Sequence, residues 1–139
     1  MTSASGEAHF SSEARGVPEG PGRFVKVADI DAVEFVPGLR FRPVLGERAM
    51  ANFVSFEPNT VAPTHVHEEE QIVVVLEGEL EFEIDGEVRT MRPGDVAVIP
   101  PWVRHGARTL ASSCLEVDVF TPPRRTLVDH ARAMAQRDR

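Results

Sequence analysis

Two histidines two residues apart, His65 and His67, are the side chains of this sequence best suited to chemistry. On an extended strand, residues i and i+2 point to the same side, so both imidazoles can face one point in space. Imidazole is a favoured ligand of zinc, nickel, iron and copper. The apolar run 72–76 follows almost at once, which would set the pair at the mouth of an apolar barrel. A single His-x-His pair is also common on protein surfaces, so it does not establish a metal site alone.

A third histidine, His105, favours the metal-site interpretation. It ends the stretch 92–105, whose residues indicate a turn, an apolar strand, a proline stop and then the histidine. Gln71 has the same parity as His65 and His67, so on a continuous strand it would point to the same inner face. The sequence therefore suggests that distant segments bring three imidazoles and one amide toward one another.

Two carboxylates lie on one face of the strand expected at 114–120. Glu116 and Asp118 share that face with Phe120, while the opposite face carries only apolar side chains. Ionisable side chains are rarely buried without a partner. Either the two carboxylates face solvent, or they face a cavity in which chemistry occurs.

The elements that must position these side chains are short strands separated by turns. Asp85-Gly86 is a two-residue hairpin turn. On its flanks glutamates form a solvated face, and the alternating apolar residues Leu80, Phe82, Ile84 and Val88 form the other. Further strands are expected at 33–36, 39–45, 48–56, 71–76, 96–99 and 114–120.

The run 48–56 is apolar enough to predict burial on both faces, and 96–99 is expected to be a buried strand. Residues 124–139 contain no helix breaker and carry apolar residues at helical spacing, which predicts a C-terminal helix with His130 on its surface. Many short strands and one helix predict an all-β fold, an antiparallel sandwich or barrel.

The size and charge of the chain exclude several classes of protein. A chain of 139 residues predicts one domain, and its net charge of −7 argues against a nucleic-acid partner. The single Cys114 cannot form an internal disulfide and predicts a reducing compartment. No apolar run is long enough for a membrane span, and residues 1–22 lack the features of a secretory signal. The expected location is the cytoplasm.

The sequence resembles the cupins in two motifs. The first, Gly-x5-His-x-His-x3,4-Glu-x6-Gly, is matched by His65, His67 and Gly78, with Asn59 and Gln71 replacing its first glycine and its glutamate. The second, Gly-x5-Pro-x-Gly-x2-His, is matched by Gly94, Pro100 and His105, with Trp102 replacing its second glycine. The resemblance covers roughly residues 53–120. It implies a double-stranded β-helix, or jelly-roll barrel, and one divalent metal, with Zn, Ni, Fe or Mn as candidates. The implied ligands are His65, His67, Gln71 and His105, and Glu70 is the rival of Gln71.

A narrower resemblance lies in Asp118-Val119-Phe120-Thr121-Pro122-Pro123-Arg124, which is similar to a segment of small cupins that open unsaturated uronates from pectin and alginate. It implies that Asp118 moves protons, Phe120 lines the pocket and Arg124 binds a substrate carboxylate. An ion pair between Asp118 and Arg124 is the structural alternative. We also consider Trp102 and Arg42 as substrate-binding candidates, although Arg40 and Arg42 could simply form a solvated strand face.

The metal-dependent aromatic polyketide cyclases of antibiotic pathways are also small cupins, and they form the second functional hypothesis. A cupin that binds a small ligand without catalysis is the third. The expected organisation is a flexible tail over 1–22, a barrel over 23–123 and a helix over 124–139. The expected partners are a small-molecule substrate and a second copy of the chain.

Overall fold

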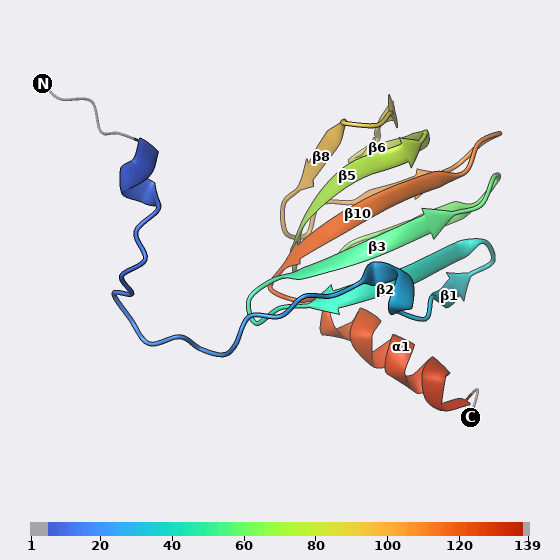
Figure 1. The fold of residues 1–139 in the computed structure, drawn as a ribbon. Coiled ribbons are helices and arrows are strands. Elements are labelled where there is room, and N and C mark those ends of the chain that lie inside the picture. Colours follow the sequence, from blue (N-terminus) through green and yellow to red (C-terminus); the bar gives the residue numbers. More distant parts are fainter. Residues whose placement is uncertain (1–5, 138–139) are drawn as a thin grey trace, which may run out of the picture.

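Two antiparallel sheets and a C-terminal helix make up the fold (Figure 1). The computed structural model describes residues 6–137. One sheet has the strand order β1 (Val33–Val36), β2 (Leu39–Leu45), β3 (Met50–Phe56), β10 (Cys114–Thr121), β5 (Glu70–Gly78) and β8 (Val96–Ile99). The other has the order β4 (Val61–His65), β9 (His105–Arg108), β6 (Leu80–Ile84) and β7 (Glu87–Met91). This arrangement confirms the predicted all-β jelly roll.

The space between the sheets holds the core because each strand alternates buried and more exposed side chains. On β3 and β10 every second side chain is buried, starting at Met50 and Cys114. Strand β10 lies between β3 and β5, and Asp118 is opposite Asn52 on one side and Val73 on the other. The central strand therefore carries its polar residues directly into the barrel interior.

Three apolar predictions were wrong in detail. The Asp85-Gly86 turn is present, but it pairs Val88 with Glu83, so Val88 lies on the outer face and is 53% exposed. Strand β8 is an edge strand with Val96 and Val98 both 55% exposed, because the core covers only the face that carries Ala97 and Ile99. The outward residues of β3 are half-buried, so that strand is not fully covered on both faces.

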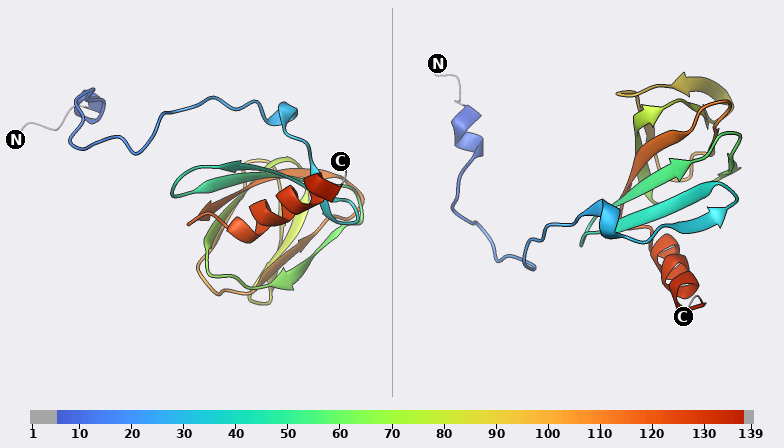
Figure 2. Two further views of the ribbon diagram at one scale, coloured as in Figure 1. Left: turned by 90° about the horizontal axis from the view of Figure 1, so that it is seen from below. Right: turned by 45° about the vertical axis from the view of Figure 1, so that its right-hand side comes forward.

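Helix α1 (Arg125–Arg137) lies across one end of the barrel (Figure 2). Its Leu127 and Val128 are buried against Met50 and Phe120. The helix was expected over 124–139, and positions 138–139 are outside the described residues, as are 1–5 of the expected tail. No helix in the described part of the chain is long and apolar enough to cross a membrane.

The N-terminal segment contains two short 3-10 helices, η1 (Gly6–His9) and η2 (Val27–Asp29). Residues 6–26 are exposed throughout, and the part toward the N-terminus leads away from the barrel (Figures 1 and 2). Nearer the barrel, Arg23 donates to the Leu45 carbonyl and Glu19 pairs with Arg48. The flexibility predicted for residues 1–22 stays a prediction.

Left-handed backbone recurs at the motif positions where cupins carry glycine. Gly78 and Gly94 have φ angles of 76° and 92°, and the two replacements, Asn59 and Trp102, have φ angles of 55° and 65°. Asparagine tolerates this region well, whereas a bulky tryptophan rarely adopts it. The replacements therefore keep the backbone course of the glycines they replace.

We predict that Gly78→Ala destabilises the fold far more than Gly94→Ala. A Cβ at Gly78 would overlap the backbone carbonyl oxygen of Ser113, whereas a Cβ at Gly94 meets open space. Gly94→Ala should therefore cost only the left-handed penalty of about 1–2 kcal/mol. Gly78→Ala should exceed that cost by several kcal/mol, because backbone atoms must shift. Chemical denaturation of both variants measures the difference, and equal losses would contradict the packing argument.

Candidate metal centre and pocket

Three histidines from separate segments meet on the inner side of the four-stranded sheet. His65 ends β4 and is paired directly with His105, the first residue of β9, while His67 follows β4 in the connection to β5. The ring centroids of His65 and His105 are 4.4 Å apart, and those of His67 and His105 are 4.8 Å apart. One nitrogen from each ring lies within 4.8 Å of the other two. Three imidazoles in this proximity could bind a metal ion.

Each of the three rings is oriented by a backbone carbonyl. The Nδ1 atoms lie 2.7 Å from the oxygen of Pro63, 2.9 Å from that of Glu69 and 2.9 Å from that of Val103, for His65, His67 and His105 in turn. A carbonyl oxygen only accepts, so each Nδ1 must carry the hydrogen. A neutral ring with its hydrogen on Nδ1 presents the lone pair of Nε2, and this is the tautomer a metal ligand needs.

Acceptor atoms crowd together at the centre of this group. The Nε2 atoms of His67 and His105 are 3.1 Å apart, and the Gln71 Oε1 atom lies 3.0 Å and 3.1 Å from them. Neutral rings have no hydrogen on these nitrogens, so three lone pairs would face one another and repel. A cation among them turns the repulsion into coordination. Ligands at right angles around an ion roughly 2.1 Å away lie about 3 Å apart, so the spacing fits a metal.

Burial keeps two of the imidazoles neutral. It lowers the pKa of His65, against the opposing effect of its hydrogen bond to Pro63. Burial, together with the charges of His65, His67 and Arg124, lowers the pKa of His105 to about 4 against the opposing hydrogen bond to Val103. A proton is therefore a poor substitute for a metal cation between these rings at neutral pH.

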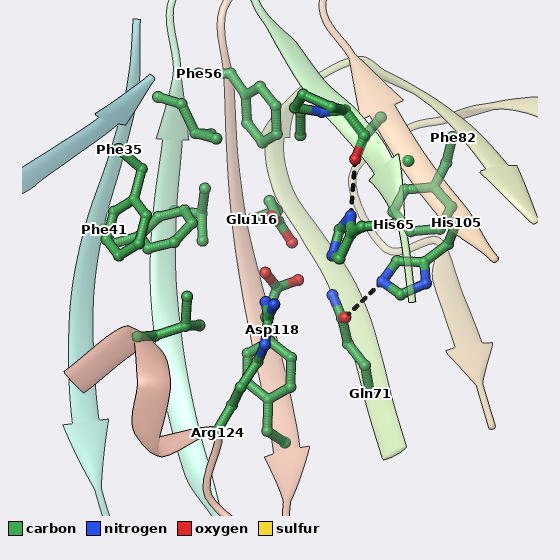
Figure 3. Close-up of a pocket in the computed structure, with 18 of the residues that line it drawn as sticks. Phe35, Phe41, Phe56, His65, Gln71, Phe82, His105, Glu116, Asp118 and Arg124 are labelled. Atoms are coloured by element: carbon green, nitrogen blue, oxygen red, sulfur yellow. Dashed lines mark hydrogen bonds between the residues drawn. The ribbon is translucent and has the colours of Figure 1, made fainter. Parts of the chain in front are cut away.

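The amide of Gln71 connects the histidines to Asp118. Its oxygen faces His67 and His105, and Figure 3 marks the contact with His105. A hydrogen bond from its other end lowers the pKa of the Asp118 carboxyl. An ionised carboxylate can only accept, so the amide NH₂ group must face Asp118 and the oxygen must face the imidazoles. Glu70, the rival ligand, is exposed, whereas Gln71 is buried. A glutamate at position 71 would set a second carboxylate against Asp118.

Glu116 and Asp118 are both buried and adjoin each other. Burial raises the pKa of Glu116, and Asp118 raises it further by charge repulsion and a hydrogen bond. Burial also raises the pKa of Asp118, while hydrogen bonds from Glu116 and Gln71 and the charge of Arg124 oppose that rise. Every cause raises the pKa of Glu116, whereas Arg124 and Gln71 oppose the rise at Asp118, so Glu116 is the member of the pair that holds a proton more readily.

Arg124 follows β10 and lies over the ring of Phe120, with its guanidinium carbon 5.9 Å from the ring centroid. Burial lowers its pKa, and Glu69 and Asp118 raise it. An arginine stays protonated in this setting, so a planar cation lines the cavity.

These residues line a cavity of about 410 Å³ whose walls are otherwise mostly aromatic and aliphatic (Figure 3). Helix α1 contributes Thr126, Leu127 and His130 to one end of it. The phenylalanines of the wall are Phe35, Phe41, Phe56, Phe82 and Phe120. The cavity therefore combines an imidazole cluster, two carboxyl groups and one arginine with a large apolar surface.

The structure gathers most of the sequence-predicted site residues into this cavity and leaves three, His67, Arg42 and Trp102, outside its lining. His65, Gln71, His105, Asp118, Phe120 and Arg124 line the cavity, and His67 contacts the other imidazoles. Arg42 instead donates from Nε to the carbonyl of Ile30 at 2.9 Å. Trp102 is 65% exposed, and its backbone N–H donates to the His67 carbonyl at 2.9 Å.

Sequence reasoning missed the roles of several residues. Asn52 is fully buried opposite Asp118, and neither atom of its amide has a partner. The sequence could have indicated Asn52, because its polar amide stands at an inward position between the apolar residues Met50 and Val54. The Glu69 carboxylate lies 3.6 Å from His67 Nδ1 and near Arg124. The wall residues Phe35 and Phe41 gave no signal, because only the fold brings β1 and β2 into the same sheet as β10 and packs these rings against the cluster that contains Phe120.

The sequence and the fold of this chain are similar to those of known cupins. The cupin domain family matches residues 52–119. KdgF from Halomonas sp. is 33% identical, with a TM-score of 0.73 over 77% of this chain and 99% of that one. An RmlC-like cupin from Shewanella frigidimarina is 25% identical, with a TM-score of 0.72 over 77% and 96%. The polyketide cyclase RemF from Streptomyces resistomycificus is 24% identical, with a TM-score of 0.66 over 74% and 81%. A search of curated protein sequences gave no match.

We predict that Glu116→Gln stabilises the fold at pH 8 and that this gain disappears near pH 4. Burial raises the pKa of Glu116 above its ordinary value of 4.5, so the unfolded chain releases this proton more readily than the fold does. The wild type therefore carries a cost above pH 4.5 that the amide does not. Thermal unfolding of both proteins across this range measures the gap. A gap independent of pH, or one that grows toward pH 4, would contradict the assignment.

Proposed function

The chain belongs to the cupin family, and we propose that it is a metal-dependent enzyme that activates a carbonyl or enol group for ring opening or isomerisation. The observation that carries the proposal is the convergence of three Nε2 atoms and one amide oxygen beside a buried carboxyl group. The fold alone would not carry it, because cupins share a fold across many activities.

His65, His67, His105 and Gln71 would hold one divalent metal ion, with zinc, nickel, iron and manganese as candidates. Such an ion supplies Lewis acidity toward a substrate oxygen. Because Gln71 is neutral where the cupin motif has a glutamate, the site would keep one more unit of positive charge. That charge favours polarisation of a carbonyl and weakens retention of the ion.

Asp118 is the group we assign to proton transfer. It lines the same cavity as the imidazoles, it is hydrogen-bonded to Gln71, and one of its oxygens has no partner. Arg124 would bind a substrate carboxylate through its planar fork, and Phe120 would form the wall beside it. A carboxyl group fixed next to a polarised carbonyl can remove or return a proton at the adjacent carbon.

The proposed substrate is a carboxylate with a carbonyl or enol group, of the unsaturated-uronate type. Support comes from the 33% identity to KdgF over nearly its whole length and from the segment that contains Asp118, Phe120 and Arg124. Cyclisation of an aromatic polyketide is the second candidate. The observation that favours it is the number of phenylalanine rings along the cavity, since a polyhydroxylated sugar acid gains little from them.

We expect protein purified without chelator to hold about one metal ion per chain. His105→Ala removes one of the metal ligands. Loss of a residue that only hydrogen-bonds a ligand reduces metal affinity by roughly 10–100-fold, so loss of the ligand itself should reduce it by more. His130→Ala is the matched control, because His130 lines the cavity but is not one of the three clustered histidines. Elemental analysis and metal titration give both values. Stoichiometric metal in neither wild type nor control would remove the enzyme proposal.

Asp118→Asn should keep the metal and lower turnover by about 10²–10⁴-fold, the usual effect of a fixed acid or base. The asparagine oxygen can still accept from Gln71, so the ligand geometry should persist. Turnover is measured on unsaturated galacturonate and on a poly-β-ketone mimic, which separates the two candidate activities. Full activity in the variant would contradict the assignment, and turnover of neither substrate by the metal-loaded wild type would favour a ligand-binding cupin.

We also propose a homodimer formed through the outer face of the six-stranded sheet. Apolar side chains continue across this face, on β3, β10, β5 and β8, and the exposed N-terminal segment carries Phe10, Val17 and Phe24. A flat apolar face can pair with its own copy about a two-fold axis.

Light scattering after gel filtration should give twice the chain mass of 15.3 kDa. Val98→Glu should shift the protein to monomer, whereas Val88→Glu, equally exposed on the other sheet, should not. A monomeric wild type would contradict the proposal, and so would a dimer that survives Val98→Glu.

A further inference from the structure

The inner end of the cavity contains a polar group that the proposed chemistry does not use. Glu116 lies one inward position farther along β10 than Asp118, opposite Val54 on β3 and Val75 on β5. It lines the cavity, it is only 4% exposed, and its Oε2 atom has no hydrogen-bond partner. A buried oxygen left unpaired costs about 1–3 kcal/mol, so this oxygen is suited to pair with a polar group of a ligand in the cavity.

The walls around Glu116 are apolar and largely aromatic. In Figure 3 its carboxyl group stands between Phe35 and Phe41 on one side and His65 on the other, with Phe56 above. Phe82 completes the wall beside the histidines. Phenylalanine rings pack well against the faces and edges of another ring. A ligand that reaches from the imidazoles to Glu116 must therefore cross an apolar chamber.

We propose that Glu116 is a hydroxyl-recognition site for a flat, largely apolar ligand that carries a phenol or enol group. The ring system would lie among the phenylalanines with its hydroxyl on the Glu116 carboxyl group. The proposal rests on the second candidate function, cyclisation of an aromatic polyketide, only in taking this ligand to be the substrate. The recognition of the hydroxyl itself depends on Glu116 and the chamber.

The protonation of the carboxyl pair explains why a neutral hydroxyl group fits. Burial and the neighbouring Asp118 raise the pKa of Glu116, so it holds its proton. A protonated carboxyl both donates and accepts, and a hydroxyl group does the same. An ammonium group would find no charge on Glu116 to offset its own. A polyhydroxylated ring would leave several hydroxyls unpaired against phenylalanine, at about 1–3 kcal/mol each.

The test compares the binding of 2-naphthol and 2-methoxynaphthalene, which differ in the hydrogen that Glu116 would accept. Calorimetry on the full chain should show at least about tenfold tighter binding of 2-naphthol by the wild type. Glu116→Leu should abolish that preference and Glu116→Gln should keep it, because an amide still donates and accepts. Glu77→Leu, at an exposed glutamate of β5, is the control and should bind like the wild type.

The same titrations on chelator-treated and zinc-loaded protein separate this proposal from the enzyme proposal. A preference that persists without metal and disappears in Glu116→Leu supports the hydroxyl site, even where turnover fails. The hydroxyl site is ruled out if the preference for 2-naphthol requires metal or persists in Glu116→Leu. It is also ruled out if the wild type shows no preference or binds neither probe. If Glu116→Leu does not fold, a crystal of the wild type with 2-naphthol decides. The hydroxyl must then lie within hydrogen-bond distance of Glu116.

Discussion

The structure depends on one electrostatic constraint: the inner ends of three imidazoles and one amide are all acceptors. Backbone carbonyls fix the hydrogen of each ring on Nδ1, so the Nε2 lone pairs of His67 and His105 face each other at 3.1 Å. Such a cluster is unfavourable without a positive charge at its centre. Burial disfavours a proton on His65 and His105, and a metal ion could supply the positive charge instead.

The orientation of Gln71 extends this constraint to the rest of the cavity. Its amide has one accepting end and one donating end, and the two ends face the imidazoles and Asp118. Central strand β10 carries Asp118, Glu116 and Phe120 on the same face, because alternate side chains of a strand share a side. The packing of β10 between β3 and β5 therefore holds the carboxyl pair in register with the ligands.

Local periodicity explains how much could be predicted from the sequence. Gln71 lies beside His67 and His105 as predicted, but the parity argument for it was wrong, because no strand continues through 66–69 and β4 and β5 belong to different sheets. Strand parity did put Glu116 and Asp118 on one face, and the Asp85-Gly86 turn marked its hairpin. The alternation of apolar residues was continued through that turn without allowing for the two turn residues. Val88 was therefore assigned to the inner face, although it pairs with Glu83 on the outer one. Periodicity also could not tell an edge strand from a central one, which is why Val96 and Val98 were expected to be buried. The aromatic chamber depends on sheet order, a long-range property that no local pattern carries.

Anomalous diffraction at the absorption edge of the bound metal tests the central claim most directly. The account predicts one ion per chain, about 2.0–2.2 Å from the Nε2 atoms of His65, His67 and His105 and from the Gln71 oxygen. It also predicts that the Gln71 NH₂ group faces Asp118. An ion bound elsewhere, or a Gln71 side chain turned away from the imidazoles in the metal-loaded protein, would contradict it.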